Sequence, residues 1–266
     1  MKTGEYWGFA ANGKHPAAKD YLRTGQSSPL MEGFVRWVEE GYRDISASKK
    51  KAGGRSYAWR FWARGGKKDA LVCGVVKDSS DGLGRLYPLL IMGTGPLPGW
   101  EDTWELLPFA CEETWSQIEF LSAHMFDEFG KLEKGISNIR QPESDWPALQ
   151  IVRKKHEKAW EMPGHPTASS WDAEGREPRA FGLKEKTEVY ISLDHSSSQD
   201  LSILISNWHH LFKTHVKAVP SATFIGGTLE KSYVAFFRRP LVSADFIRLW
   251  SIDCAEVKSD GSCIPG

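Results

Sequence analysis

This sequence has few cysteines, no excess of either charge and no long apolar run. Its four cysteines are scattered without a C-x-x-C pair, which favours a reducing cytosol over a disulfide scaffold. The 34 basic and 34 acidic residues cancel, so nothing draws the chain as a whole to nucleic acid or to an acidic membrane. No window approaches the roughly 20 apolar residues of a membrane span. We therefore expect a soluble, cytoplasmic protein that neither binds nucleic acid nor inserts into a membrane.

Aromatic and aliphatic residues are abundant instead. Hydrophobic residues make up 41% of the 266, with 12 tryptophans and 13 phenylalanines among the aromatics, which is enough for a sizeable core. Apolar residues spaced by three and four positions predict a helix over 29–44, capped by Ser28. Alternating and continuous apolar runs predict strands at 56–64, 70–76 and 86–93, and the first two read as a hairpin.

A long helix is predicted over 109–138, because apolar residues recur there every three or four positions. Just before it, Asp102 and Glu105 resemble a capping box. The polar, proline-bearing stretch 140–185 is interpreted as a connecting segment with one charged helix near 147–161. The remainder predicts a strand, a helix, two strands and a helix, at 188–194, 199–215, 221–227, 231–239 and 243–250.

Together these elements predict an α/β fold. We expect a mixed β-sheet with helices packed on both faces, as a three-layer α/β/α sandwich. A doubly wound parallel sheet fits less well, because several strands read as hairpin neighbours. We expect an N-terminal α/β module over 1–145. A linker and a C-terminal α/β part should follow over 146–266, packed with the first module as one globular unit.

The stretch Gly74 to Ile91, GVVKDSSDGLGRLYPLLI, is the first candidate for chemistry. Its glycines and Arg85 could cradle a phosphate only if a helix followed, yet a strand is predicted there. Its serines lack the glycine elbow of a nucleophile and an assignable histidine base. We interpret the serines and Asp81 as capping a turn between two strands.

The histidines and the adjacent acids predict no metal site. His210 and His215 lack the i, i+4 spacing that places two ligands on one helix face, and with His209 they are interpreted as a solvated helix end. His15 is interpreted as a loop residue. The adjacent acids at 112–113 do not face one another on a helix, so they are interpreted as solvated charge.

Arg60 lies between aromatic residues in a predicted strand, where its guanidinium needs a carboxylate, an aromatic face or water. Asp81 or Asp20 is its expected partner. If Arg60 and Arg85 meet an acid, the cluster locks three segments together. If they are exposed, they form a docking patch for a partner that carries a carboxylate or a phosphate.

Three ordered blocks of the sequence carry one further pattern. The first, GFAANGKHPAAKDY, follows the form G-F-x-G-K-x-P-x-x-G-D-F with two extra residues and with Lys19 at a glycine position. The second is the W-R-F of residues 59–61. The third follows G-V-x-x-P-S-x-D-x-x-G-R-x-(F/Y)-P-L, with Asp78 at the proline position. The matching residues are Gly8, Phe9, Gly13, Lys14, Pro16, Asp20, Tyr21, Trp59, Arg60, Phe61, Gly74, Val75, Ser79, Asp81, Gly84, Arg85, Tyr87, Pro88 and Leu89.

In these blocks the chain resembles the TagF family, also called ImpM, of bacterial type VI secretion. The resemblance covers roughly residues 8–92 and is weak beyond about 145. It implies an α/β sandwich and a cytoplasmic, non-enzymatic accessory protein that represses type VI secretion after translation. It also implies binding to secretion components, among them a forkhead-associated scaffold protein, and no cofactor.

The resemblance and the motifs leave two alternatives open. One is a hydrolase or phosphatase-like enzyme that acts on a secretion component, with Asp20, Asp81 and Arg85 in its site. The other is a structural subunit of the secretion apparatus. No catalytic or metal residue is assigned. The candidate cluster for partner binding or for structure is Lys14, Asp20, Arg60, Asp81 and Arg85.

Overall fold

The computed structural model describes residues 6–48, 55–160, 186–193, 201–216 and 218–252. The strands within these ranges are β1 (Gly8–Gly13), β2 (Leu22–Gly25), β3 (Ala58–Arg64), β4 (Ala70–Lys77), β5 (Leu89–Pro96), β6 (Glu188–Leu193), β7 (Ala222–Gly227) and β8 (Ser232–Phe237). The helices are α1 (Pro29–Ser48), the 3-10 turn η1 (Trp104–Leu106), α2 (Leu107–Ala110), α3 (Glu112–Ala123), α4 (Phe129–Ser137), α5 (Trp146–Trp160), α8 (Leu201–Val216) and α9 (Ser243–Leu249).

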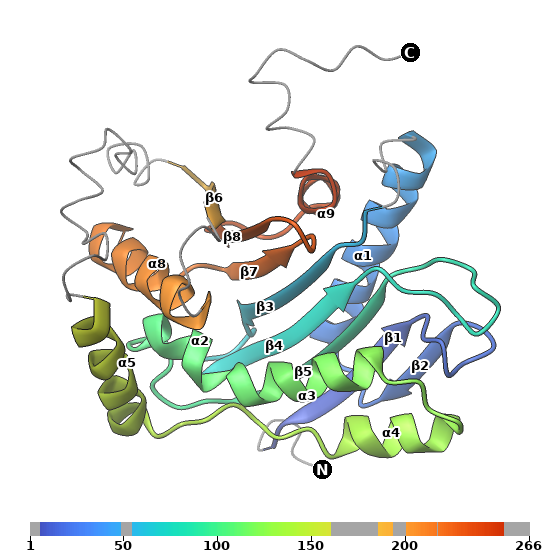
Figure 1. The fold of residues 1–266 in the computed structure, drawn as a ribbon, viewed down its shortest axis with the longest axis horizontal. Helices are drawn as coiled ribbons and strands as arrows, with labels where there is room; N and C mark the ends of the chain where they lie inside the picture. The colour runs from blue at the N-terminus through green and yellow to red at the C-terminus, as the bar shows by residue number, and fades with distance from the viewer. Residues whose placement is uncertain (1–5, 49–54, 161–185, 194–200, 217, 253–266) are drawn as a thin grey trace.

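The eight described strands form one sheet in the order β2-β1-β5-β4-β3-β7-β8-β6 (Figure 1). The α/β class is confirmed, but the prediction of a mixed sheet is wrong, because every described pairing is antiparallel. Parallel neighbours require a crossover connection, often a helix. Here the helical connections lead to strands that are not neighbours: β6 and β7, on either side of α8, are separated by β8.

The predicted N-terminal elements are present. The helix expected over 29–44 is α1, and the Ser28 hydroxyl accepts the Met31 backbone N–H at 3.1 Å, as an N-cap does. The hairpin is formed by β3 and β4, and β4 is buried along all but its two ends. The third predicted strand is β5, which pairs with β4. The stretch from Gly74 to Ile91 therefore connects two neighbouring strands.

The single helix predicted over 109–138 is wrong, and so is the capping box before it. The chain forms α2, α3 and α4 instead, with His124 in an extended conformation after α3. A straight helix of this length would span about 45 Å, whereas the break lets α4 fold back beside α3 and lie against β1 and β2. Gly135 permits this packing, since a Cβ there would approach Leu121 Cδ2 to 2.4 Å. Thr103, not Asp102, is the N-cap of η1, and it makes no side-chain cap.

Two apolar clusters lie against the sheet. Side chains alternate along a strand, so Trp62 enters one cluster and Phe61 the other. The cluster with Phe61 includes residues of α1 and α9, and the cluster with Trp62 includes residues of η1, α2, α3, α4, α5 and α8. Figure 1 shows α3 and α4 in front of the sheet and α1 behind it. Apolar side chains therefore cover both faces of the sheet.

The sheet continues from the first half of the chain into the second. β3 pairs with β7 in a register that runs from Ala58 opposite Gly227 to Ala63 opposite Ala222. The charged helix predicted near 147–161 is α5, and the rest of the predicted connecting segment, 161–185, lies outside the described residues. Among the described helices, none has both the length and the apolar character of a membrane span.

Candidate functional site

Asp81 is the centre of a polar cluster in the β4–β5 connection. Its side chain has no exposed surface. Oδ1 accepts the backbone N–H groups of Leu83 at 3.0 Å and Arg85 at 2.9 Å, and Oδ2 lies 3.0 Å from Lys14 Nζ and 2.7 Å from Arg85 Nε. Loss of solvent would raise the pKa of Asp81, but the hydrogen bonds from Arg85, Lys14 and Leu83 outweigh it and hold the pKa well below its ordinary value. The carboxylate is therefore charged, and both of its oxygens are engaged by donors of the protein itself.

Arg85 connects this turn to the loop that follows β1. Its Nη2 donates to the Lys19 carbonyl oxygen at 2.9 Å and lies 3.2 Å from Asp20 Oδ1. A backbone bond from Gly82 to the Ala18 carbonyl, 2.8 Å long, joins the same two loops. The side chains of Arg85 and Asp20 are 50% and 73% exposed. The structure thus brings Lys14, Asp20, Asp81 and Arg85 together, with Asp81 buried, Lys14 partly buried and the other two at the surface.

Arg60 lies outside that cluster, so the prediction of Asp81 or Asp20 as its partner is wrong. Its Nε and Nη2 each donate to Glu119 at 2.7 Å, and its Nη1 donates to Glu112 at 2.9 Å. The guanidinium also lies 5.7 Å from the centre of the Trp115 ring. The partners come from α3, which lies over β4 and β5, so Arg60 ties the neighbouring strand β3 to that helix. Glu112 is accordingly paired charge and not the solvated charge expected from the sequence.

His15 lies in a loop, as predicted, but it is buried. Its Nε2 donates to the Leu121 carbonyl oxygen at 3.0 Å, near the end of α3, and its Nδ1 accepts the Ala17 backbone N–H at 3.0 Å. Burial lowers the pKa of His15, with the bond to Leu121 acting in the opposite direction. The ring is therefore neutral and fixes the loop after β1 to α3.

His209 is buried in the core, so its interpretation as part of a solvated helix end is wrong. Trp62 Nε1 donates to His209 Nε2 at 3.1 Å, and His209 Nδ1 donates to the Ile205 carbonyl oxygen at 2.8 Å. Burial lowers the pKa of His209 to about 4. Across the described residues, no group of three or more histidine, cysteine, aspartate or glutamate side chains is arranged to hold a metal ion.

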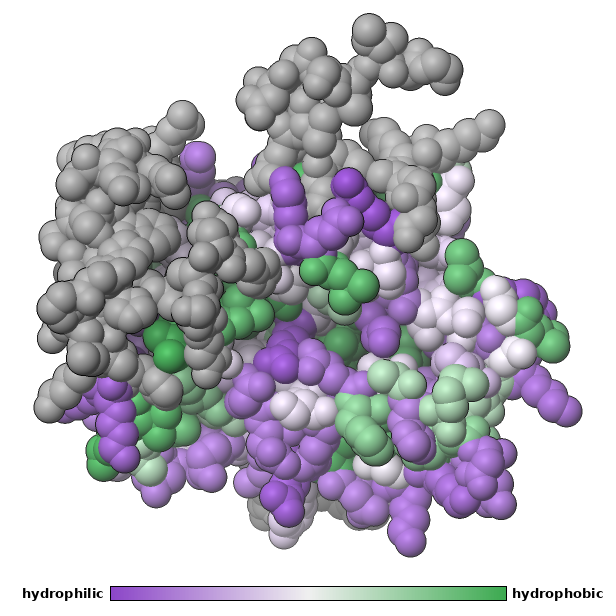
Figure 2. All heavy atoms as spheres, in the orientation of Figure 1, coloured by the Kyte–Doolittle hydropathy of each residue, from purple (hydrophilic) through white to green (hydrophobic). Residues whose placement is uncertain are grey.

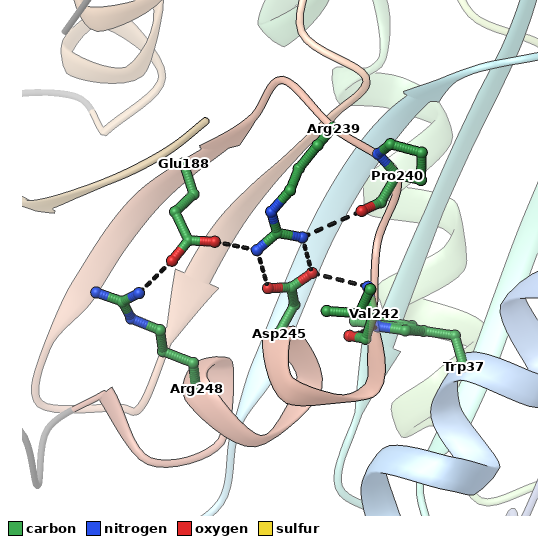
Figure 3. A network of polar contacts seen from close by, with 7 residues as sticks. All are labelled: Trp37, Glu188, Arg239, Pro240, Val242, Asp245 and Arg248. Atoms are coloured by element: carbon green, nitrogen blue, oxygen red, sulfur yellow. Dashed lines mark hydrogen bonds and ion pairs between the residues drawn. The ribbon is translucent and has the colours of Figure 1, made fainter. Parts of the chain in front are cut away.

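A second charge network, shown in Figure 3, was not anticipated from the sequence. Arg239 donates from both Nη atoms to Asp245, each at 2.7 Å, and from Nη2 to Glu188 of β6, which also accepts from Arg248. Asp245 accepts the Val242 backbone N–H at 2.9 Å as well. The signal available in the sequence was an arginine in front of a proline turn with an acid six residues later. The network fastens α9 and the edge strand β6 to the turn after β8.

Comparison with known proteins identifies the domain that carries the first cluster. Residues 10–140 match the model of the TagF N-terminal domain, which is type VI secretion system-associated. Among solved structures, the chain is similar to that of PA0076 from Pseudomonas aeruginosa PAO1, with 16% identity over 97% of both chains and a TM-score of 0.48. No curated protein matches. Since the domain match contains Lys14, Asp20, Arg60, Asp81 and Arg85, we conclude that this chain is a TagF family member and a type VI secretion-associated protein.

Proposed function

We propose that this protein is a non-enzymatic, post-translational repressor of type VI secretion that binds a forkhead-associated scaffold component in the cytoplasm. The match of residues 10–140 to a type VI secretion-associated domain carries the proposal. The family motif residues Lys14, Asp81 and Arg85 lie within that match, and Lys14 and Arg85 both contact Asp81. In this proposal the motif residues stabilise the fold of the domain, and the folded domain binds the partner.

The contacts of the motif residues favour binding over turnover. A general acid or base needs a lone pair or proton within reach of substrate and a pKa near the working pH. Asp81 has no exposed side-chain surface, four protein donors and a lowered pKa. Arg60 likewise gives its donors to Glu112 and Glu119. We therefore assign these groups to holding loops and helix α3 in place.

The proposal is tested in the native cell by deleting the gene and measuring export of a type VI effector. A repressor predicts that export rises while the amounts of the secretion components stay the same. Export that does not change would overturn the proposal. Export that stops would instead identify a structural subunit of the apparatus.

A second experiment separates binding from catalysis. The purified chain is titrated calorimetrically with the purified forkhead-associated component, and the same mixture is assayed for phosphate released from phosphorylated secretion components. The proposal predicts saturable binding and no release above the rate without the chain. Release that depends on the chain and falls in an Asp81→Asn variant would favour the phosphatase alternative.

A further inference from the structure

Apolar side chains are exposed where α3 ends and α4 begins. Phe120 is 61% exposed and Met125 69%, and Figure 2 shows hydrophobic side chains at the surface in this part of the molecule. Beside them is a groove of about 280 Å³, lined by Ser116, Gln117, Phe120, Leu121 and Gly135. This volume is below the range of ordinary small-molecule pockets, about 300–1,000 Å³. The groove is better suited to a side chain of another protein.

The exposed aromatic side chains are ordered by contact with one another. Phe120 stacks on His124 with ring centres 5.0 Å apart, and His124 meets the edge of Phe126 at 4.5 Å. Phe126 in turn packs against the core and lies 6.2 Å from the buried His15 ring. Single exposed apolar residues are ordinary on protein surfaces, whereas contiguous ones mark contact sites. This row is anchored at one end and open at the other, so little side-chain freedom remains to be lost on binding.

Lys77 lies on the other flank of α3. It ends β4 opposite Ala58 and is half-buried. Among the described contacts its ammonium has no hydrogen-bond acceptor or ion pair; Glu119, the acid whose charge acts on it, accepts instead from Arg60. Burial lowers the pKa of Lys77, and Glu119 opposes that effect. A cation that has lost water without gaining an acceptor is destabilised in the isolated chain, and an acceptor from a partner would remove that cost.

Most of the other charged groups around the row are paired. Glu112 and Glu119 share the single positive charge of Arg60, and Glu113 lies 3.8 Å from Arg140. Asp127, just before α4, is paired with Lys131. The second carboxylate of the Glu112 and Glu119 pair offsets the charge of Lys77, so what Lys77 lacks is a hydrogen-bond acceptor and not an opposite charge.

From these two observations, and resting on the proposed function, we infer that the outer surface of α3 is the docking face for the protein partner. The partner segment places an apolar side chain against Phe120 in the groove and a carboxylate against Lys77. A helix with its side chains is about 10 Å across. A standard interface, of about 800 Å² on each partner, spans that width and reaches both flanks. The carboxylate gives Lys77 the charge-assisted hydrogen bond that it lacks in the free chain.

The test uses the full chain and the purified forkhead-associated component, with affinity measured by calorimetry. Phe120→Ser and Lys77→Gln should each weaken binding about tenfold or more, since each removes a side chain that the partner contacts directly. Lys68→Gln is the matched control, because Lys68 is an exposed lysine at the turn that begins β4, at the opposite end of that strand. It should bind as the wild type does.

The results separate this inference from the function on which it rests. If the wild type binds and both variants bind within about twofold of it, the docking face is overturned and the proposed function stands. If the wild type does not bind, both are overturned. Thermal unfolding gives a measurement without the partner: Lys77→Gln should leave Tm unchanged or raise it. A fall in Tm comparable to that of a core substitution would show that Lys77 has a structural role, and would also overturn the inference.

Discussion

Two clusters in this protein share one plan, a buried aspartate held by an arginine in the same turn. Asp81 is bound by Arg85 four residues later, and Asp245 by Arg239 six residues earlier. Each aspartate also accepts a backbone N–H of its own turn. Each cluster reaches a distant segment through a further charged residue. The repeated plan shows how a short turn can be fixed to a sheet without apolar side chains.

The two clusters differ in how their outer members meet the solvent. Arg85 is 50% exposed and its second acid, Asp20, 73%. Arg239 is 28% exposed and its second acid, Glu188, 23%. The outer residues of the cluster at Asp245 are largely shielded from solvent between β6 and α9. In the cluster at Asp81, only the aspartate and Lys14 are shielded, and Arg85 and Asp20 face the solvent. Stability should therefore depend more strongly on Arg239 than on Arg85, although both arginines bind a buried carboxylate.

The largest effect is expected for Arg239→Met. The substitution leaves Asp245 buried with its charge unpaired and removes a contact of Glu188, which should cost about 3 kcal/mol of unfolding free energy. Denaturant unfolding at neutral pH measures it. Arg248→Met is the control, because it contacts the same Glu188 from a side chain that is 55% exposed, and it should cost less than about 1 kcal/mol. Equal losses of unfolding free energy in the two variants would contradict the claim that the shielded arginine stabilises the fold more than the exposed one.

A somewhat smaller effect is expected from acid, through the buried histidines and not through the carboxylates. The pKa of His209 is lowered from the ordinary 6.5 to about 4, so the unfolded chain binds a proton in this window and the folded chain does not. Stability should be complete above pH 6.5 and fall by on the order of 2–3 kcal/mol as the pH drops to about 4. His15 acts in the same direction.

The measurement is unfolding free energy as a function of pH for the wild type, His209→Gln and the exposed control His124→Gln. The slope between pH 6.5 and 4 should be shallower in His209→Gln and unchanged in the control. A wild-type stability that is flat across this window would show that His209 is not held neutral in the fold.

Asp81→Asn tests the first cluster directly. The variant keeps the shape of the side chain but loses the charge that Lys14 and Arg85 contact, so Tm should fall by roughly 5 °C at neutral pH. The pKa of Asp81 is lowered in the folded state, so its contribution is present above the ordinary value of 3.8 and is lost as pH falls below it. The difference in Tm between wild type and variant should therefore shrink below about pH 4. A constant difference would exclude the charge as its cause.

The smallest effect is expected for Arg85→Ala. The side chain is half exposed, and Asp81 keeps Lys14 and two backbone donors in its absence. Tm should fall by less than in Asp81→Asn, by about 2 °C or less. Thermal unfolding of the two variants side by side shows which has the larger fall in Tm. A larger fall for Arg85→Ala would show that the bonds of Arg85 to the loop after β1 contribute more stability than the charge of Asp81.

Local patterns predicted those parts whose signals lie close together in the sequence. The Ser28 cap with its apolar stripe predicted α1, and the turn between two apolar runs predicted the β3–β4 hairpin. The family motif predicted that Lys14, Asp81 and Arg85 belong to one cluster. Each of these inferences needed only the turn chemistry and the side-chain period of one or two neighbouring elements.

The rest depended on contacts between distant segments. Arg60 meets Glu112, 52 residues later, because α3 packs on β4 and β5, and β4 is the neighbour of β3. Trp62 and His209 are 147 residues apart and meet because β7 adds to β3 and α8 covers the strands beyond it. The apolar period over 109–138 continues through the break at His124, because α3 and α4 bury one side each against the same sheet. A period of this kind reports which residues are buried, and not whether one helix or two buries them.

The central claim is that the motif cluster holds the fold while the partner docks on α3. The most direct measurement is an affinity pull-down from the native cell with wild type, Arg85→Ala and Phe120→Ser, each first shown by its Tm to be folded, with the recovered secretion components quantified. The account predicts that Arg85→Ala recovers these components as the wild type does and that Phe120→Ser does not. Loss of recovery in Arg85→Ala with full recovery in Phe120→Ser would contradict it.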